Sequence, residues 1–133
     1  MAGISQLLEK ERVIAVVGAS RNKDKYGYKV FHTLKEKSYR VYAVNPNASE
    51  IDGVRAYHSI KELPEKADLV IIVVPPHIAK KVVREAKEQG ISNVWLQPGS
   101  EDEGVLALCK ELSLNCIHGL CYIRDGLKTD FIL

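Results

Sequence analysis

The sequence predicts an α/β fold in which helices cover both faces of a mostly parallel, five-stranded sheet. Short apolar runs alternate along the chain with amphipathic patterns of about ten residues, an alternation typical of parallel sheets with right-handed crossovers. The run over 69–74 is apolar on both faces, as a central strand covered on both sides should be. We therefore expect a Rossmann-like, doubly wound, three-layer sandwich.

Length and composition predict one small domain over residues 1–133. A hydrophobic content of 46% is enough for a core that buries about two-thirds of the unfolded surface. The net charge is only +2 and no apolar stretch approaches the ~20 residues of a membrane span, which argues against a nucleic-acid or membrane binder. The chain starts without a signal-peptide pattern, and its three cysteines lack paired spacing, so a cytoplasmic protein with reduced thiols is expected.

In the first half of the chain, the spacing of apolar residues predicts helices that alternate with strands. Apolar residues predict, in order, a short helix over 4–8, a strand over 13–17, a helix over 27–37, a strand over 40–44 and a short edge strand within 51–57. Ser59 and Glu62 have the spacing of a capping box, so a one-turn helix is expected there, and Pro64 ends it.

The second half continues the alternation. It predicts, in order, a central strand over 69–74 ended by two prolines, a helix that stops at Gly90, a strand over 93–96, a further helix and a strand over 115–117. The apolar face of the first of these helices consists of Ile78, Val82, Val83 and Ala86. Ser100 and Glu103 form a second capping box, which predicts the start of a helix that includes Leu112.

Four segments that follow predicted strands form the candidate ligand site. In a sheet of this kind, ligands bind at the carboxyl ends of the strands, near the point where the strand order reverses. The four segments are rich in small, amide or proline residues, and we call them the rim. They are Gly18-Ala19-Ser20, Asn45-Pro46, Val74-Pro75-Pro76 and Gln97-Pro98-Gly99.

The residue types of the rim suit a flat base and a diphosphate. Gly18 lets a ligand approach the backbone closely, and Ser20 can donate its hydroxyl to a phosphate. The helix that follows adds unpaired N–H groups and partial positive charge at its start. Asn45 and Gln97 offer amides to a ribose or a base, and the prolines offer rigid apolar surface. For the first segment alone, a plain strand-to-helix turn capped by Ser20 is the alternative.

A basic loop follows the first rim segment. It carries one acid, Asp24, against four basic residues, namely Arg21, Lys23, Lys25 and Lys29. This excess of positive charge suits a ligand with more phosphate than NAD, although such a loop is also compatible with plain solvated surface. Asn45 stands where a dinucleotide binder usually has an acid for a ribose hydroxyl.

In this order and spacing, the segments resemble the single-domain CoA-binding protein family, which is similar to the CoA-binding domain of the succinyl-CoA synthetase alpha subunit. The resemblance is carried by residues 17–20 with the loop through Tyr28, and by 44–46, 73–76, 94–99 and Cys121. It implies a domain that binds coenzyme A through its ADP part. Pyrophosphate would lie on residues 18–20, and the basic loop would meet the phosphates. Asn45, Val74 and Pro75 would line the nucleotide pocket, with 97–99 nearby.

No motif for catalysis is found in the sequence. There is no Gly-x-Ser-x-Gly elbow, no base is placed beside Ser20, and no pair of acids is placed by a motif. We expect a stand-alone binding protein for CoA or acyl-CoA, a carrier, sensor or subunit whose partner is a small molecule. One alternative is an NAD(P)-binding oxidoreductase or a fragment of one, against which the missing Gly-x-Gly-x-x-Gly counts. Another is a regulatory domain that has lost its ligand.

The last part of the chain adds three smaller expectations. Cys116, His118 and Cys121 lack the spacing of a structural zinc site, so no metal is expected. The Cys121 thiol is a candidate for a mixed disulfide with CoA, and a buried structural cysteine is the alternative. The apolar tail 131–133 would dock on the core or on a second copy of the chain, which makes a homo-oligomer a candidate assembly.

Overall fold

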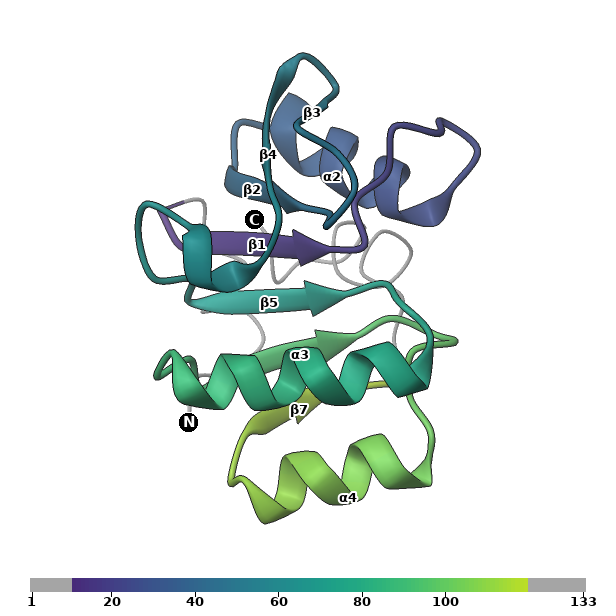
Figure 1. The fold of residues 1–133 in the computed structure, drawn as a ribbon, viewed down its shortest axis with the longest axis vertical. Coiled ribbons are helices and arrows are strands. Elements are labelled where there is room, and N and C mark those ends of the chain that lie inside the picture. Colours follow the sequence, from purple (N-terminus) through teal and green to yellow (C-terminus); the bar gives the residue numbers. More distant parts are fainter. Residues whose placement is uncertain (1–10, 120–133) are drawn as a thin grey trace.

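The structure is a computed structural model, and it describes residues 11–119 (Figure 1). The elements are, in order, β1 (Val13–Val17), α2 (Tyr26–Glu36), β2 (Arg40–Val44), β3 (Glu50–Ile51), β4 (Val54–Tyr57), the 3₁₀ turn η1 (Ile60–Glu62), β5 (Leu69–Ile72), α3 (Pro76–Glu88), β6 (Asn93–Leu96), α4 (Glu103–Glu111) and β7 (Asn115–Ile117). The helix expected over 4–8, Cys121 and the apolar tail lie outside the described residues. Between residues 11 and 119, no helix is long and apolar enough to cross a membrane.

The sheet has the doubly wound order β3-β4-β2-β1-β5-β6-β7. All of its neighbouring strands are parallel except β3 and β4. Val17 of β1 is in register with Val44 of β2 and with Ile72 of β5, and Ile72 is in register with Leu96 of β6. The chain segments that leave these four strands therefore start level with one another, at one edge of the sheet.

The sheet has seven strands, whereas the sequence predicts five. Five of the seven match the strands expected over 13–17, 40–44, 69–74, 93–96 and 115–117, and the other two come from the segment at 50–57. The segment expected to hold one short edge strand folds instead as the antiparallel hairpin β3–β4, in which Ile51 pairs with Val54. Its turn is Asp52-Gly53, and both residues have positive φ, 52° and 79°. An Asp-Gly pair in this conformation is a preferred two-residue hairpin turn, so it was the sequence signal for the extra strand. β4 then extends the sheet parallel to β2.

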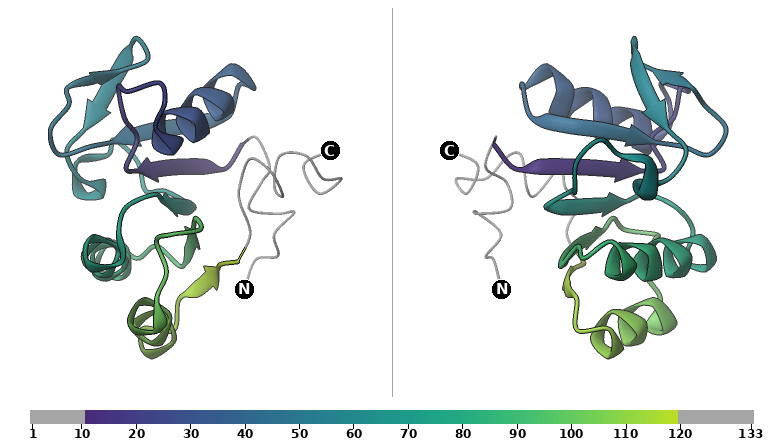
Figure 2. Two further views of the ribbon diagram at one scale, coloured as in Figure 1. Left: turned by 90° about the vertical axis from the view of Figure 1, so that its right-hand side faces the viewer. Right: turned by 60° about the vertical axis from the view of Figure 1, so that its left-hand side comes forward.

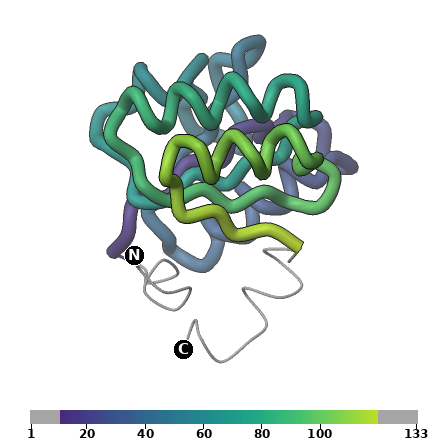
Figure 3. The backbone as a smooth tube through the Cα atoms, turned by 90° about the horizontal axis from the view of Figure 1, so that it is seen from below, coloured from purple at the N-terminus to yellow at the C-terminus, as the bar shows by residue number. Residues whose placement is uncertain are grey.

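Helices cover both faces of the sheet, which confirms the predicted three layers (Figure 2). Side chains of β1 alternate between two cores. Ile14 and Val16 belong to the core that includes Phe31 and Leu34 of α2. Val13, Ala15 and Val17 belong to the core beneath α3 and α4, two helices that lie side by side (Figure 3).

Both predicted capping boxes are wrong in detail. Ser59 is the N-cap residue of η1, but its side chain makes no capping hydrogen bond. In α4, Asp102 is the N-cap, and its Oδ1 accepts from the N–H of Val105 at 2.8 Å. Ser100 lies two residues before this cap, and its hydroxyl bonds elsewhere, as described below. A carboxylate at Asp102 outcompetes the more distant serine because it lies directly before the first helical turn.

One predicted boundary shifts near the prolines, and one residue predicted on a buried helix face is exposed. β5 ends at Ile72 rather than at residue 74, although the N–H of Val73 still donates to the Val17 carbonyl at 2.8 Å. α3 starts at Pro76, where a missing N–H costs nothing. Ile78 is 37% exposed, so the buried face of α3 uses Ala79 in its place.

Candidate functional site

The strand order reverses between β1 and β5, and the candidate site lies at the carboxyl ends of these strands. Two cavities open there and share Gly18, Asn45 and Val74 in their walls. We call the larger one, about 450 Å³, the α3 cavity, because α3 forms one of its walls. The second, about 400 Å³, is called the loop cavity, because the basic loop and the start of α2 line it.

The turn after β1 requires glycine at two positions. Gly18 has φ of +101°, and a Cβ there would lie 2.3 Å from the carbonyl oxygen of Val73. A Cβ on Gly27, the second residue of α2, would lie 1.9 Å from the carbonyl oxygen of Gly18. The start of α2 therefore touches the turn itself. This contact brings the N-terminus of α2 to the end of β1.

The loop cavity is lined by small and polar groups, with the start of α2 among them. Its walls include Ser20, Lys25 and Gly27. α2 has no side-chain cap and no acid in its first turn, so the partial positive charge of its helix dipole is not offset there. The Ser20 hydroxyl oxygen accepts from the N–H of Asn22 at 3.0 Å, which leaves its own hydrogen free to donate. This geometry suits a phosphate group.

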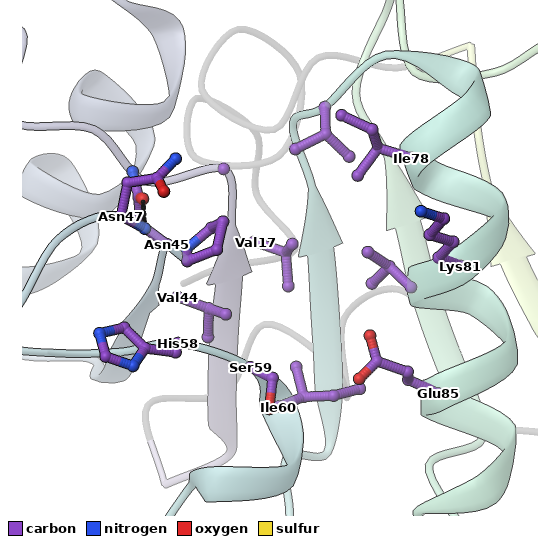
Figure 4. Close-up of a pocket in the computed structure, with 14 residues that line it drawn as sticks. Val17, Val44, Asn45, Asn47, His58, Ser59, Ile60, Ile78, Lys81 and Glu85 are labelled. Atoms are coloured by element: carbon purple, nitrogen blue, oxygen red, sulfur yellow. Dashed lines mark hydrogen bonds between the residues drawn. The ribbon is translucent and has the colours of Figure 1, made fainter.

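The α3 cavity is largely apolar, with polar groups at its margins (Figure 4). Val17, Val44 and Ile60 lie in its middle part. Lys81 and Glu85 reach it from α3, opposite the wall that carries Asn45, Asn47 and His58. An apolar space with a few polar groups around it suits a flat ring or an alkyl arm.

Asn45 connects the two turns that border both cavities. Its Nδ2 donates to the carbonyl oxygen of Ala19 at 2.8 Å, and its Oδ1 accepts from the N–H of Asn47 at 2.7 Å. Both ends of the amide are thus bonded within the protein. The side chain holds the turn after β1 against the turn after β2, a positioning role that the sequence analysis did not foresee.

Ser100 holds in place the segment that follows β5, which lines both cavities through Val74. Its side chain is buried, accepts from the N–H of Val74 at 3.1 Å and donates to the carbonyl of Ile72 at 3.0 Å. The carbonyl of Ile72 also accepts from the N–H of Gln97 at 3.1 Å. Ser100 therefore ties the segment after β6 to the segment that lines both cavities.

We expect Ser100→Ala to lower the free energy of unfolding by about 1.5 kcal/mol, since the half-buried N–H of Val74 loses its partner. The Ile72 carbonyl keeps its bond from Gln97, which limits the loss. Urea unfolding measures this change. Ser59→Ala is the control: that hydroxyl makes no capping bond, so the free energy should change by less than about 0.5 kcal/mol. Equal losses in the two variants would contradict the role given to Ser100.

Tyr28 faces the β3–β4 turn. Its hydroxyl donates to Oδ1 of Asp52 at 3.1 Å, while Nδ1 of His32 and Nζ of Lys35 lie 2.7 and 3.1 Å from Oδ2. Burial acts to raise the pKa of Asp52, but hydrogen bonds from His32, Lys35 and Tyr28 outweigh it and lower this pKa. Tyr28 is not among the residues that line the two cavities, whereas Tyr26 lines the loop cavity.

The remaining rim residues take different places. Pro46 lines the α3 cavity, and Ala19 is fully buried beneath the turn. Pro75 and Pro76 open α3 and are not in the walls of the two cavities. The same holds for the segment after β6: Gln97 is 1% exposed, and Pro98 and Gly99 lie on the surface. Arg21 and Lys23 are exposed on the basic loop.

Several cavity residues were missed in the sequence. His58 follows β4, and because β4 is parallel to β2, the strand-end rule would have placed it once the hairpin was recognised. Lys81 and Glu85 are one helical turn apart on α3, but only the packing of α3 on the sheet directs them to the cavity. Within residues 11–119, no group of three His, Cys, Asp or Glu side chains is arranged to hold a metal ion.

The strand order, the turn at Gly18 after β1 and the start of α2 without a side-chain cap define a Rossmann-like domain of the nucleotide-binding class. Residues 12–126 match the family described as CoA binding domain. The chain therefore belongs to the CoA-binding domain family, which confirms the resemblance seen in the sequence.

Known relatives include both long and short proteins. The alpha subunit of an ADP-forming acetate–CoA ligase II from Pyrococcus furiosus is 48% identical over 84 residues, which cover 62% of this chain and 18% of the subunit. The uncharacterized protein YneT of Bacillus subtilis is 30% identical, with 90% of this chain and 89% of that protein covered. A solved structure of a conserved hypothetical protein from Pyrococcus furiosus has a TM-score of 0.80 and 39% identity, covering 84% of this chain and 97% of the other. The chain thus spans less than a fifth of the ligase subunit but most of the two short relatives.

Proposed function

We propose that this chain binds coenzyme A or an acyl-CoA across the two cavities, as a stand-alone module without a catalytic domain. The observation that carries the proposal is the meeting of a polar and an apolar cavity at Gly18, Asn45 and Val74, in a member of the CoA-binding domain family. Coenzyme A has the same division, with a phosphorylated nucleotide at one end and a thiol-bearing arm at the other.

The loop cavity supports the assignment of the phosphates. Lys25, the Ser20 hydroxyl and the start of the α2 helix dipole provide a cation, a donor and partial positive charge at one place. Arg21 and Lys23 stand on the same exposed loop and would add charge around a multiply anionic ligand. The α3 cavity would then take an uncharged part of the ligand, because apolar side chains dominate its walls.

Two considerations support a binding role without chemistry. In the loop cavity, the hydroxyl of Ser20 is hydrogen-bonded to the backbone N–H of Asn22 and not to a side chain that could act as a general base. The chain also matches the short relatives over most of their length, whereas it covers only a small part of the ligase subunit. We therefore propose that this chain shares CoA binding with its relatives, but not the reaction of the ligase. A carrier, a sensor and a subunit of a larger enzyme all remain consistent with this role.

Thermal melting with CoA, NAD, NADP and ATP tests the proposal. A ligand at one hundred times its dissociation constant adds about 2.7 kcal/mol of stability, which corresponds to roughly 10 °C for a domain of this size. We expect CoA to give the largest shift. An equal or larger shift with NADP would favour an NAD(P)-binding enzyme. No shift with any of the four would favour a domain that has lost its ligand.

The basic loop gives a second, independent measurement. We expect Lys25→Ala to weaken CoA binding roughly tenfold, because a charged hydrogen bond to a phosphate contributes about 1.5–3 kcal/mol. Arg21→Ala and Lys23→Ala should weaken it in the same direction. Lys29→Ala is the control, because it also removes one positive charge, but from an exposed residue that does not line the loop cavity. Calorimetric titration that gives one affinity for all four variants would identify the loop as plain surface.

A further inference from the structure

A third cavity lies at the β7 edge of the sheet and contains two cysteines. It measures about 240 Å³ and lies between α4 and β7. Its walls include Cys109, Lys110, Cys116 and His118. It shares no lining residue with the α3 cavity or the loop cavity. The proposed function makes no use of these residues.

The chain turns sharply between the two cysteines and brings them together. Cys109 lies in the last turn of α4 and is buried. Ser113 has φ of 58°, and the N–H of Leu114 donates to the carbonyl of Cys109 at 2.9 Å, which returns the chain to the end of the helix. Two residues later, Cys116 points to the same core as Leu114. Both cysteines line the same cavity, one from α4 and one from β7.

The surroundings of the two cysteines favour a state in which one thiol is ionised and the other keeps its proton. A hydrogen bond from Cys116 lowers the pKa of the Cys109 thiol, although burial acts in the opposite direction. The same hydrogen bond raises the pKa of Cys116, and burial and the negative charge of Glu101 add to this effect. One cysteine can therefore ionise while its neighbour still carries a proton. This is the arrangement that thiol–disulfide exchange needs, since a thiolate attacks first and a second thiol follows.

We propose that Cys109 and Cys116 form a dithiol site that small-molecule disulfides convert reversibly to an internal disulfide. In the first step, the Cys109 thiolate attacks one sulfur of the disulfide, a mixed disulfide forms, and one small thiolate leaves. In the second step, Cys116 loses its proton and attacks the Cys109 sulfur, which expels the second small thiolate. The cysteines are oxidised by two electrons and the small disulfide is reduced to two thiols, with the protons from the cysteines passing to the departing thiolates.

Oxidised glutathione tests the proposal on the full chain carrying Cys121→Ser, which leaves only the two relevant thiols. Trypsin cleaves after Lys110, so Cys109 and Cys116 fall on separate peptides, 88–110 and 111–124. We expect the folded protein to lose both free thiols, to become lighter by two hydrogen atoms and to yield these two peptides as a linked pair. Dithiothreitol should reverse all three changes.

Two further measurements complete the test. In the unsubstituted chain, fragmentation of the linked pair should place the bond at Cys116 rather than at Cys121. Cys116→Ser is the matched control, and it should give no linked peptides. The proposal is wrong if the folded protein keeps both thiols free, if it gains glutathione without a link, or if the link forms only in denaturant. None of these results depends on whether the chain binds CoA.

Discussion

Gly27→Ala is expected to lower the free energy of unfolding by about 3 kcal/mol, because the added methyl group meets backbone atoms. The new Cβ would lie 1.9 Å from the carbonyl oxygen of Gly18, a distance that no side-chain rotation can relieve. Either α2 or the turn after β1 must move. Since this turn lines both cavities, CoA affinity should fall as well. Urea unfolding and calorimetric titration measure the two effects.

Gly104→Ala is a matched control for this prediction. Gly104 is also the second residue of its helix, α4, so the two substitutions change helix propensity in the same way. A Cβ on Gly104 would lie 2.7 Å from Nζ of Lys80, the end of a flexible side chain that can move into solvent. Oδ1 of Asp102 would lie 3.3 Å away, so this side chain needs to shift by only a small amount. The free energy of unfolding should therefore change by less than about 1 kcal/mol. Similar losses in both variants would show that the contact between α2 and the turn does not constrain the fold.

The fold could be predicted largely because its central strands are nearly pure apolar runs. β1 and β2 lie at the predicted residues, and β5 falls within the predicted run. The hairpin was missed because its strands are short and mostly exposed, so that their apolar signal is weak, although Asp52-Gly53 marks the turn. Ser100 was misassigned because spacing alone cannot tell a capping hydroxyl from one that binds a neighbouring strand end.

The site was harder to predict than the fold. The four rim segments were correctly predicted to lie at one edge of the sheet, because this placement depends only on parallel strands in register. Which side chains face a cavity depends on packing between distant segments. Lys81 and Glu85 reach the α3 cavity only because α3 lies over β5, whereas Tyr28 turns away to bind Asp52. No periodicity in the sequence contains that information.

Asn45→Asp is expected to weaken CoA binding at least tenfold and to lower the free energy of unfolding by about 2 kcal/mol. The substitution keeps the shape of the side chain but replaces Nδ2, which donates to the Ala19 carbonyl at 2.8 Å, with an oxygen that cannot donate. Two acceptors then face each other where the turns after β1 and β2 are joined. The new negative charge also lies in the wall of both cavities, where it would repel a phosphorylated ligand.

Asn47→Asp separates the charge from the lost hydrogen bond. Asn47 lines the α3 cavity but is exposed, and it takes part in the junction only through its backbone N–H. We expect this variant to keep its stability within about 0.5 kcal/mol and to weaken CoA less than Asn45→Asp does. If both variants lost stability and affinity equally, added charge alone would explain the result. If only Asn45→Asp is impaired, the amide bridge between the two turns is what holds the binding edge in shape.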